Sequence, residues 1–121
     1  MFISKKELGK LGEETAANYL RKKGYRIIFR NFSCPLGEID LIAEDKTHLV
    51  FVEVRTRRGY SFGLPEESVD WRKQKKLRRL AGYFLSCYNI NNKSCRFDVI
   101  AIQVNKEAGI IQEIRHITSA F

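Results

Sequence analysis

The sequence lacks the features that would place it in a secreted, membrane-spanning or zinc-stapled class. Its three cysteines are an odd number with no CxxC pair, which argues against a disulfide framework and a paired-thiolate zinc site and favours a reducing compartment. No apolar run approaches the roughly 20 residues of a membrane-spanning helix, and the N-terminal segment has no apolar signal-peptide core. We therefore expect a cytoplasmic protein with no membrane partner.

Acidic residues are too few to balance the basic ones. The 121 residues contain 22 Lys and Arg against 14 Asp and Glu, which gives a net charge of +8 and an isoelectric point of about 9.6. This excess is typical of a protein that binds a polyanion, and charge alone does not separate nucleic acid from an acidic membrane surface. The length and the 44% hydrophobic content suit one core, so we expect a single domain over residues 1–121.

Apolar spacing predicts seven elements in the order α-β-β-β-α-β-β. The predicted helices cover residues 7–23, with Ser4 as a candidate N-cap and Gly24 as the stop, and 65 or 66 to 88. The predicted strands cover 25–31, 38–43, 49–55, 95–104 and 110–117, and residues 56–66 are expected to form a loop. A short polar segment joins the second and third strands, so we expect an antiparallel pair. The connection through the second helix is long enough for a crossover to a parallel strand. The fold class is therefore α/β or α+β, with a central mixed sheet flanked by helices.

Two acids interrupt apolar strands. Asp40 lies in GEIDLIA and Glu53 lies in FVEVR, and an unpaired buried carboxylate is costly. If the two strands pair, the acids come close together, and a divalent cation is a common remedy for their repulsion. Glu38 has the same strand parity as Asp40 and is a further candidate for the metal shell. The alternative is pairing with nearby arginines: Arg26 or Arg30 for Asp40, and Arg55 or Arg57 for Glu53.

A third acid lies on the first predicted helix. Glu13 belongs to the run LGEETAANYL, where it is flanked by Gly12 and followed by small residues. A glycine on a packed helix face lets the helix backbone approach a neighbouring sheet closely. We therefore expect Glu13 to approach the strands that carry the other two acids.

Taken together, these segments resemble the YraN family of small bacterial proteins. The similarity rests on LGEETAANYL, KGYRIIFRN, GEIDLIAED, LVFVEVRTR and the RKQKKL helix, which occur in the family's order from about residue 8 to residue 102. That family is assigned to the PD-(D/E)XK, or restriction-endonuclease-like, superfamily and is similar to archaeal Holliday-junction resolvases. The resemblance implies a nucleic-acid-binding protein, specifically a Mg²⁺- or Mn²⁺-dependent endonuclease that cuts structured or branched DNA, and a homodimer.

The resemblance also assigns roles to individual residues. It implies that Asp40, Glu53 and Glu13 are the metal ligands, that Arg55 takes the place of the motif lysine, and that Gln74 supports the site from the second helix. A guanidinium holds a phosphate bidentately but cannot act as a general base, because its pKa lies above about 12. Both an active endonuclease and a non-catalytic nucleic-acid-binding module on the same scaffold therefore remain open.

Basic residues crowd the start of the second predicted helix. Six of the nine residues in WRKQKKLRR carry a positive charge, and such a block repels itself unless a polyanion is present. Tyr60, Phe62 and Trp71 are available to stack on bases, and the alternative is that Phe62 and Trp71 anchor the preceding loop on the core. A membrane-surface role for this helix is less favoured, because the strands need it as a cover. The predicted phosphate contacts are Arg57, Arg58, Arg72, Lys73, Lys75, Lys76, Arg78 and Arg79.

Overall fold

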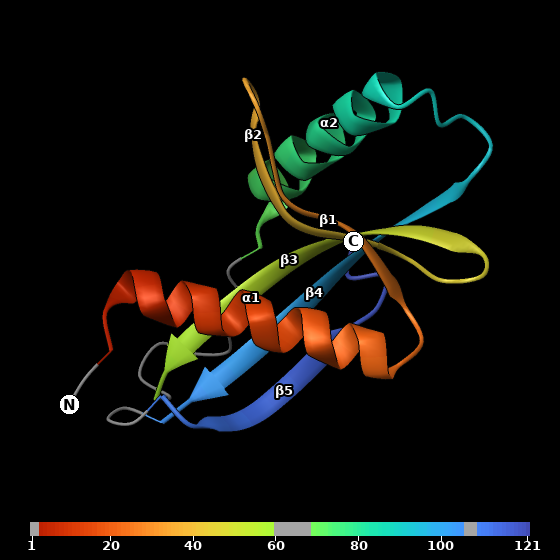
Figure 1. The fold of residues 1–121 in the computed structure, drawn as a ribbon. Coiled ribbons are helices and arrows are strands. Elements are labelled where there is room, and N and C mark those ends of the chain that lie inside the picture. The colour runs from red at the N-terminus through yellow and green to blue at the C-terminus, as the bar shows by residue number, and fades with distance from the viewer. Residues whose placement is uncertain (1–2, 60–68, 106–108) are drawn as a thin grey trace.

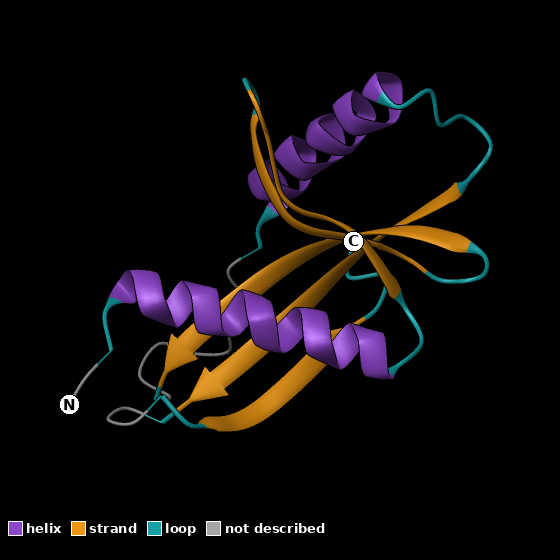
Figure 2. Ribbon diagram, in the orientation of Figure 1, coloured by secondary structure: helices purple, strands orange, loops and turns teal. Residues whose placement is uncertain are grey.

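The computed structural model describes residues 3–59, 69–105 and 109–121 (Figures 1 and 2). It is an α+β fold, and it confirms the predicted order of elements. No helix in these described ranges is long and apolar enough to cross a membrane. The elements are α1 (Lys5–Lys22), β1 (Arg26–Cys34), β2 (Gly37–Glu44), β3 (His48–Arg58), α2 (Trp71–Cys87), β4 (Ser94–Val104) and β5 (Ile111–Ile117).

The five strands form one mixed sheet in the order β1-β2-β3-β4-β5. β3 and β4 are parallel, as the long connection through α2 allows, and the other neighbouring pairs are antiparallel. The β2–β3 pairing runs from Glu44 opposite Leu49 to Leu41 opposite Val52. Beyond that point β2 and β3 separate, and the next residues in this register are Asp40 and Glu53.

Each helix covers one face of the sheet, because side chains alternate along the strands. Val50 and Val52 of β3 pack with Leu20 in the core beneath α1. Phe51, the residue between them, packs with Leu80 in the core beneath α2. Figure 1 shows α1 crossing the sheet at β3 and β4, while α2 lies beside the outer ends of β1 and β2.

The capping of α1 was predicted correctly and the start of α2 was not. The predicted N-cap of α1 is confirmed: the helix begins at Lys5, directly after Ser4, because the Ser4 hydroxyl and the Glu7 carboxylate form a capping box. α2 begins at Trp71 and not at 65 or 66, since the Asp70 side chain accepts a hydrogen bond from the Lys73 amide and caps the helix there. Residues 60–68, including Tyr60 and Phe62, lie outside the described residues.

Two strands are longer than their apolar runs predict. β1 extends to Cys34, because its last residues pair with the start of β2. β3 continues beyond its predicted end at residue 55 and includes residues 56–58, which were predicted to be loop. They are strand because they pair with Ile102, Gln103 and Val104 of β4. The basic side chains of Arg57 and Arg58 therefore project from a strand, which fixes their direction more firmly than a loop would.

Candidate active site

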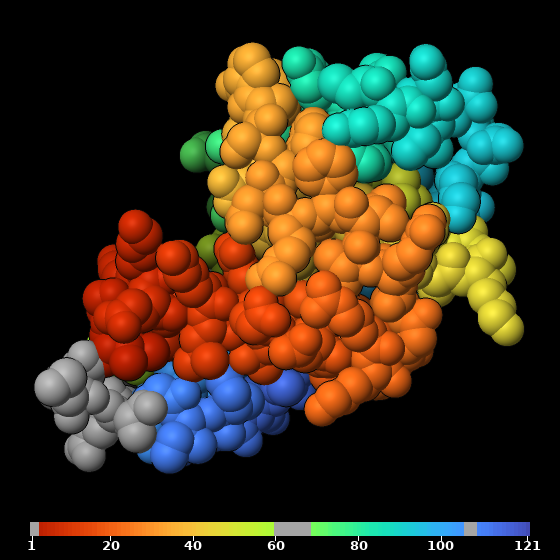
Figure 3. Space-filling view, viewed as in Figure 1, coloured from red at the N-terminus to blue at the C-terminus, as the bar shows by residue number. Residues whose placement is uncertain are grey.

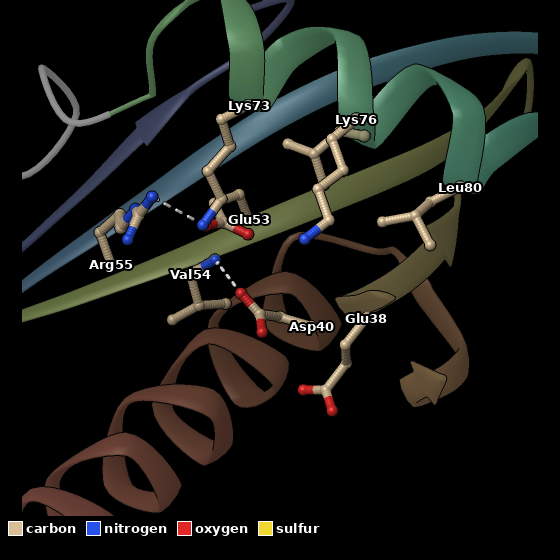
Figure 4. Close-up of a pocket in the computed structure, with 9 residues that line it drawn as sticks. Glu38, Asp40, Glu53, Val54, Arg55, Lys73, Lys76 and Leu80 are labelled. Carbon is tan, nitrogen blue, oxygen red and sulfur yellow. Dashed lines mark hydrogen bonds and ion pairs between the residues drawn. The ribbon is translucent and has the colours of Figure 1, made fainter. Parts of the chain in front are cut away.

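The site forms where β2 separates from β3. The Val54 amide donates a 2.8 Å hydrogen bond to Asp40 Oδ2. The Asp40 side chain therefore accepts a hydrogen bond from the β3 backbone just beyond the last β2–β3 residue pair. A hollow of about 350 Å³ opens at this point between the sheet and α2 (Figure 4). It is lined by Glu38, Asp40, Glu53, Val54, Arg55, Lys73, Lys76, Leu77 and Leu80.

The Asp40 carboxyl group is unusually easy to protonate. Burial raises the pKa of Asp40 to about 7, and the neighbouring charges of Glu53 and Glu13 act in the same direction. The hydrogen bond from the Val54 amide opposes the shift and does not cancel it. A carboxyl group in this position is stabilised as an anion when a cation binds beside it, which is a property of metal-ligating acids.

Glu53 is buried and paired with two cations. Its side chain is 7% exposed, and Glu53 Oε2 lies 2.9 Å from Lys73 Nζ and 3.2 Å from the Arg55 guanidinium (Figure 4). The Arg55 pairing was the alternative that the sequence left open for this acid. Arg55 Nε is itself buried and has no hydrogen-bond partner among the residues that the structure describes. The charge of Glu53 is therefore neutralised locally, and it serves to position Lys73 and Arg55 at the wall of the hollow.

The acids that converge are Glu13, Glu38 and Asp40. Each of them offers an oxygen atom, and these three atoms lie within 4.8 Å of one another. The predicted ligand set contained Glu13 and Asp40 with Glu53 as the third member. In the structure Glu38 completes the cluster, while Glu53 lies beside it. Two elements supply this cluster: Glu13 comes from α1, and Glu38 and Asp40 come from β2, where their shared strand parity already grouped them.

Helix α2 contributes lysines to the hollow. Lys73 and Lys76 line it together with Leu77 and Leu80, which are their neighbours on the same helix face. Gln74, which the resemblance assigns to the site, turns elsewhere, and its side-chain amide donates to the Val69 carbonyl at 3.2 Å. Lys73, and not Gln74, therefore reaches Glu53 and the hollow from α2.

Several of the other predicted phosphate-binding residues lie outside the hollow. Arg78 lies over the rings of Phe97 and Phe121, 5.2 and 5.5 Å from their centroids, which holds it away from the hollow. Arg58 donates to the Ile3 carbonyl. Trp71 is 66% exposed, so it does not anchor the core, and Arg72 lies against its ring. The remaining α2 cations, Lys75 and Arg79, are exposed to solvent.

A second buried carboxylate, Asp98, belongs to a structural network. It accepts hydrogen bonds from Arg96, His116 and the Ser119 amide, at 2.7 to 3.1 Å. Burial alone would raise the pKa of Asp98, but the hydrogen bonds from His116 and Arg96 hold it below its ordinary value. These bonds join β4, β5 and the last residues of the chain, so Asp98 secures the sheet.

Comparison with known proteins assigns the chain to a family. The profile of the uncharacterised protein family UPF0102 matches residues 12–102, which include all four acids of the site. The UPF0102 protein of Desulforamulus reducens is 53% identical over 122 residues, 99% of each chain, and that of Pelotomaculum thermopropionicum is 48% identical over the full length of both chains. The relative from Caldanaerobacter subterraneus is 45% identical over 98% of both chains. The resemblance stated from the motifs is thereby confirmed, and the chain belongs to UPF0102, the YraN family.

Proposed function

We propose that the protein is a Mg²⁺- or Mn²⁺-dependent nuclease that hydrolyses phosphodiester bonds in structured or branched DNA. The observation that carries the proposal is the convergence of Glu13, Glu38 and Asp40 beside two lysines in one hollow. Acids alone would suit a cation, and lysines alone would suit a phosphate. Their juxtaposition suits a cation and a phosphate together, which is the arrangement that metal-assisted phosphoryl transfer requires.

The donor set fits a hard divalent cation. Carboxylate oxygens are the ligands that Mg²⁺ and Mn²⁺ prefer, and Mg²⁺ keeps several waters when a substrate phosphate completes its shell. Glu13, Glu38 and Asp40 are the residues that would hold the ion. When bound there, it would polarise a phosphoryl oxygen and lower the pKa of a coordinated water.

The basic residues have a separate role in this proposal. Lys73 and Lys76 present ammonium groups to the hollow, where they bind phosphate oxygens and stabilise the negative charge that develops during hydrolysis. Glu53 holds Lys73 and Arg55 in place through its two ion pairs. Arg55 remains charged at every relevant pH, so it contributes charge and does not accept a proton.

The first test compares two neighbouring acids on α1. Purified protein should cut at least one of a set of labelled duplex, single-stranded, flap and four-way-junction DNAs with Mg²⁺ or Mn²⁺, and none with EDTA. Glu13→Gln should slow cutting by about 10- to 100-fold, because a ligand is lost. Glu14→Gln should leave the rate unchanged, since Glu14 pairs with Arg30 at 2.8 Å outside the cluster.

Two results would contradict the proposal. One is that every DNA substrate and its RNA equivalent stay intact with both metals. The other is that Glu13→Gln and Glu14→Gln cut equally well.

A second test asks which cation takes over the role of the motif lysine. Lys73→Ala should lower the turnover rate by about 10²-fold, the usual cost of one donor to a developing negative charge. Arg55→Gln should retain most of the activity, because in this proposal Lys73 supplies the charge and Arg55 only pairs with Glu53. Single-turnover cleavage at saturating protein measures both. Equal losses in the two variants, or a loss only in Arg55→Gln, would assign the role to Arg55.

The alternative function is a nucleic-acid-binding module without catalysis. The observation that favours it is the neutralisation of Glu53 by Lys73 and Arg55, which occupies one acid of the predicted metal set. It predicts salt-sensitive DNA binding that survives Glu13→Gln, with no metal-dependent cutting by the unaltered protein.

A further inference from the structure

The hollow at the acid cluster continues along β3. A second hollow of about 250 Å³ shares Val54 and Arg55 with the first, and a third of the same size shares Lys5, Leu8, Thr56 and Arg57 with the second. The shared wall residues place the three hollows next to one another along β3. We call the continuation the β3 trough and define it by Lys5, Leu8, Gly9, Thr56, Arg57 and Arg58.

The trough exists because, among the described residues, no strand pairs with the outer half of β3 on the β2 side. β2 pairs with β3 only as far as Leu41 opposite Val52, whereas β4 accompanies β3 to Arg58. The first half of α1 lies over this uncovered edge (Figure 1). Gly9 has open space where a side chain would begin. In Figure 3 the molecular surface is concave between α1 and the outer ends of β1 and β2.

The sign of the charged side chains changes along the trough, from acidic at the acid cluster to basic away from it. Glu13 lies at the end where the trough meets the acid cluster. Away from that end, the charged wall residues within the described part of the chain are Lys5, Arg57 and Arg58, which are all basic. The basic side chains of the trough thus begin beside the acid cluster and continue away from it. This arrangement suits a nucleic-acid backbone that places one phosphate at the acid cluster and the following phosphates along the basic side chains.

The small size of the trough favours a single strand as its occupant. Its two hollows of about 250 Å³ are smaller than the about 300–1,000 Å³ of a drug-sized ligand pocket. The α2 cations Lys75 and Arg79 are exposed and lie outside the trough, so they are available to a duplex.

We propose that the β3 trough binds the phosphate backbone of a single strand that leaves the cleavage site. The inference rests on the proposed function and narrows its substrate to nucleic acid with an unpaired segment beside the cleaved bond, such as a flap or a splayed branch. Lys5 and Arg57 are the phosphate-binding residues of the trough.

The test compares two pairs of charge deletions. Lys5→Ala/Arg57→Ala removes two basic side chains of the trough, and Lys22→Ala/Lys46→Ala removes the same charge from exposed positions outside the trough. Fluorescence anisotropy in EDTA would measure the affinity for a labelled 12-nucleotide single strand and for a 12-base-pair duplex. The trough pair should weaken single-strand binding about tenfold and flatten its salt dependence by about 1.4 in the log–log slope, which corresponds to two phosphate contacts.

The duplex affinity and the control pair should each change by no more than about twofold. Arg57→Lys should bind the single strand nearly as well as the unaltered protein, which shows that charge and not a fold defect is measured. The inference is overturned if the trough pair weakens duplex binding equally, or if the control pair weakens single-strand binding equally.

Failure of this inference is distinguishable from failure of the proposed function. If the unaltered protein cuts DNA and the trough pair behaves like the control, only the trough assignment falls. If the trough pair selectively loses single-strand affinity and no metal supports cutting, the trough stands and catalysis falls. If the unaltered protein binds no nucleic acid at low salt, both fall.

Discussion

Asp40→Asn should abolish metal-dependent cutting and, at the same time, make the protein more stable at pH 8. The loss of cutting should be about 10³-fold, because the charge stabilisation that a bound metal supplies is worth several kcal/mol. The gain in stability follows from the raised pKa of Asp40, whose ionised form is disfavoured by burial and by the charge of Glu53. The asparagine keeps an oxygen that accepts the hydrogen bond of the Val54 amide.

The sign of the pH dependence follows from proton counts. The unfolded chain releases the Asp40 proton near pH 3.8, and the folded protein releases it near pH 7. Between these values the folded state holds more protons, so Asp40 makes the folding free energy less favourable as the pH rises, and the whole cost is present above pH 7. A pKa raised from 3.8 to about 7 corresponds to a cost of at most about 4 kcal/mol.

Thermal unfolding at a series of pH values measures this effect. Asp40→Asn and the unaltered protein should unfold at similar temperatures near pH 4, and the variant should lead by several degrees at pH 8. Mg²⁺ should then raise the unfolding temperature of the unaltered protein and leave that of the variant unchanged. If Asp40→Asn unfolds at a lower temperature than the unaltered protein at pH 8, the claim that ionised Asp40 destabilises the folded state is contradicted.

Asp45→Asn is the matched control of opposite sign. The backbone amides of Thr47 and His48 hold the pKa of Asp45 below its ordinary value, so its ionised form is favoured in the folded state. Its contribution is present above the unfolded pKa and is lost as the pH falls through the folded pKa. Asp45→Asn should therefore destabilise the protein at pH 8 and leave cutting intact, since Asp45 lies in the β2–β3 turn.

The sequence was sufficient for the parts of the site that depend on strand parity. Alternation placed Glu53 and Arg55 on one face, and the hairpin register brought Asp40 beside Glu53. The extent of β3 was not predictable in this way. Residues 56–58 have no apolar pattern, and they are strand only because distant β4 residues pair with them. Long-range pairing of this kind leaves no local signal in the sequence.

Which α2 side chain reaches the site depends on the rotation of α2 about its own axis, and the sequence pattern does not determine that rotation. Extending the buried stripe of Leu77 and Leu80 by one turn reaches both Lys73 and Gln74, and a helix face cannot include both equally. The long lysine side chain reaches the buried Glu53 at 2.9 Å, while Gln74 bonds to the Val69 carbonyl. The six-residue basic block likewise divides, because the Phe97 and Phe121 rings hold Arg78.

Gly12→Ala should be among the most damaging single methyl additions in the protein. A Cβ atom at Gly12 would lie 1.8 Å from Thr56 Oγ1, a distance that no packed structure tolerates. The Thr56 side chain must rotate or α1 and β3 must separate, and overpacking of this kind costs about 1–3 kcal/mol. We expect the unfolding temperature to fall by about 10 °C. Cutting should also weaken, since Glu13 follows Gly12 and would move away from Glu38 and Asp40.

Two further variants separate the clash from an ordinary glycine effect. Gly9→Ala places the same methyl group on the same helix with nothing within 4 Å, so it should stabilise the protein by about 0.5–1 kcal/mol. Thr56→Ala removes the atom that Gly12→Ala would strike, and the double variant should recover most of the lost stability. Non-additivity between positions 12 and 56, with none between 9 and 56, is the expected double-mutant cycle. If Gly12→Ala stabilises as Gly9→Ala does, then α1 does not contact β3 closely, and Glu13 cannot reach the acid cluster from this helix.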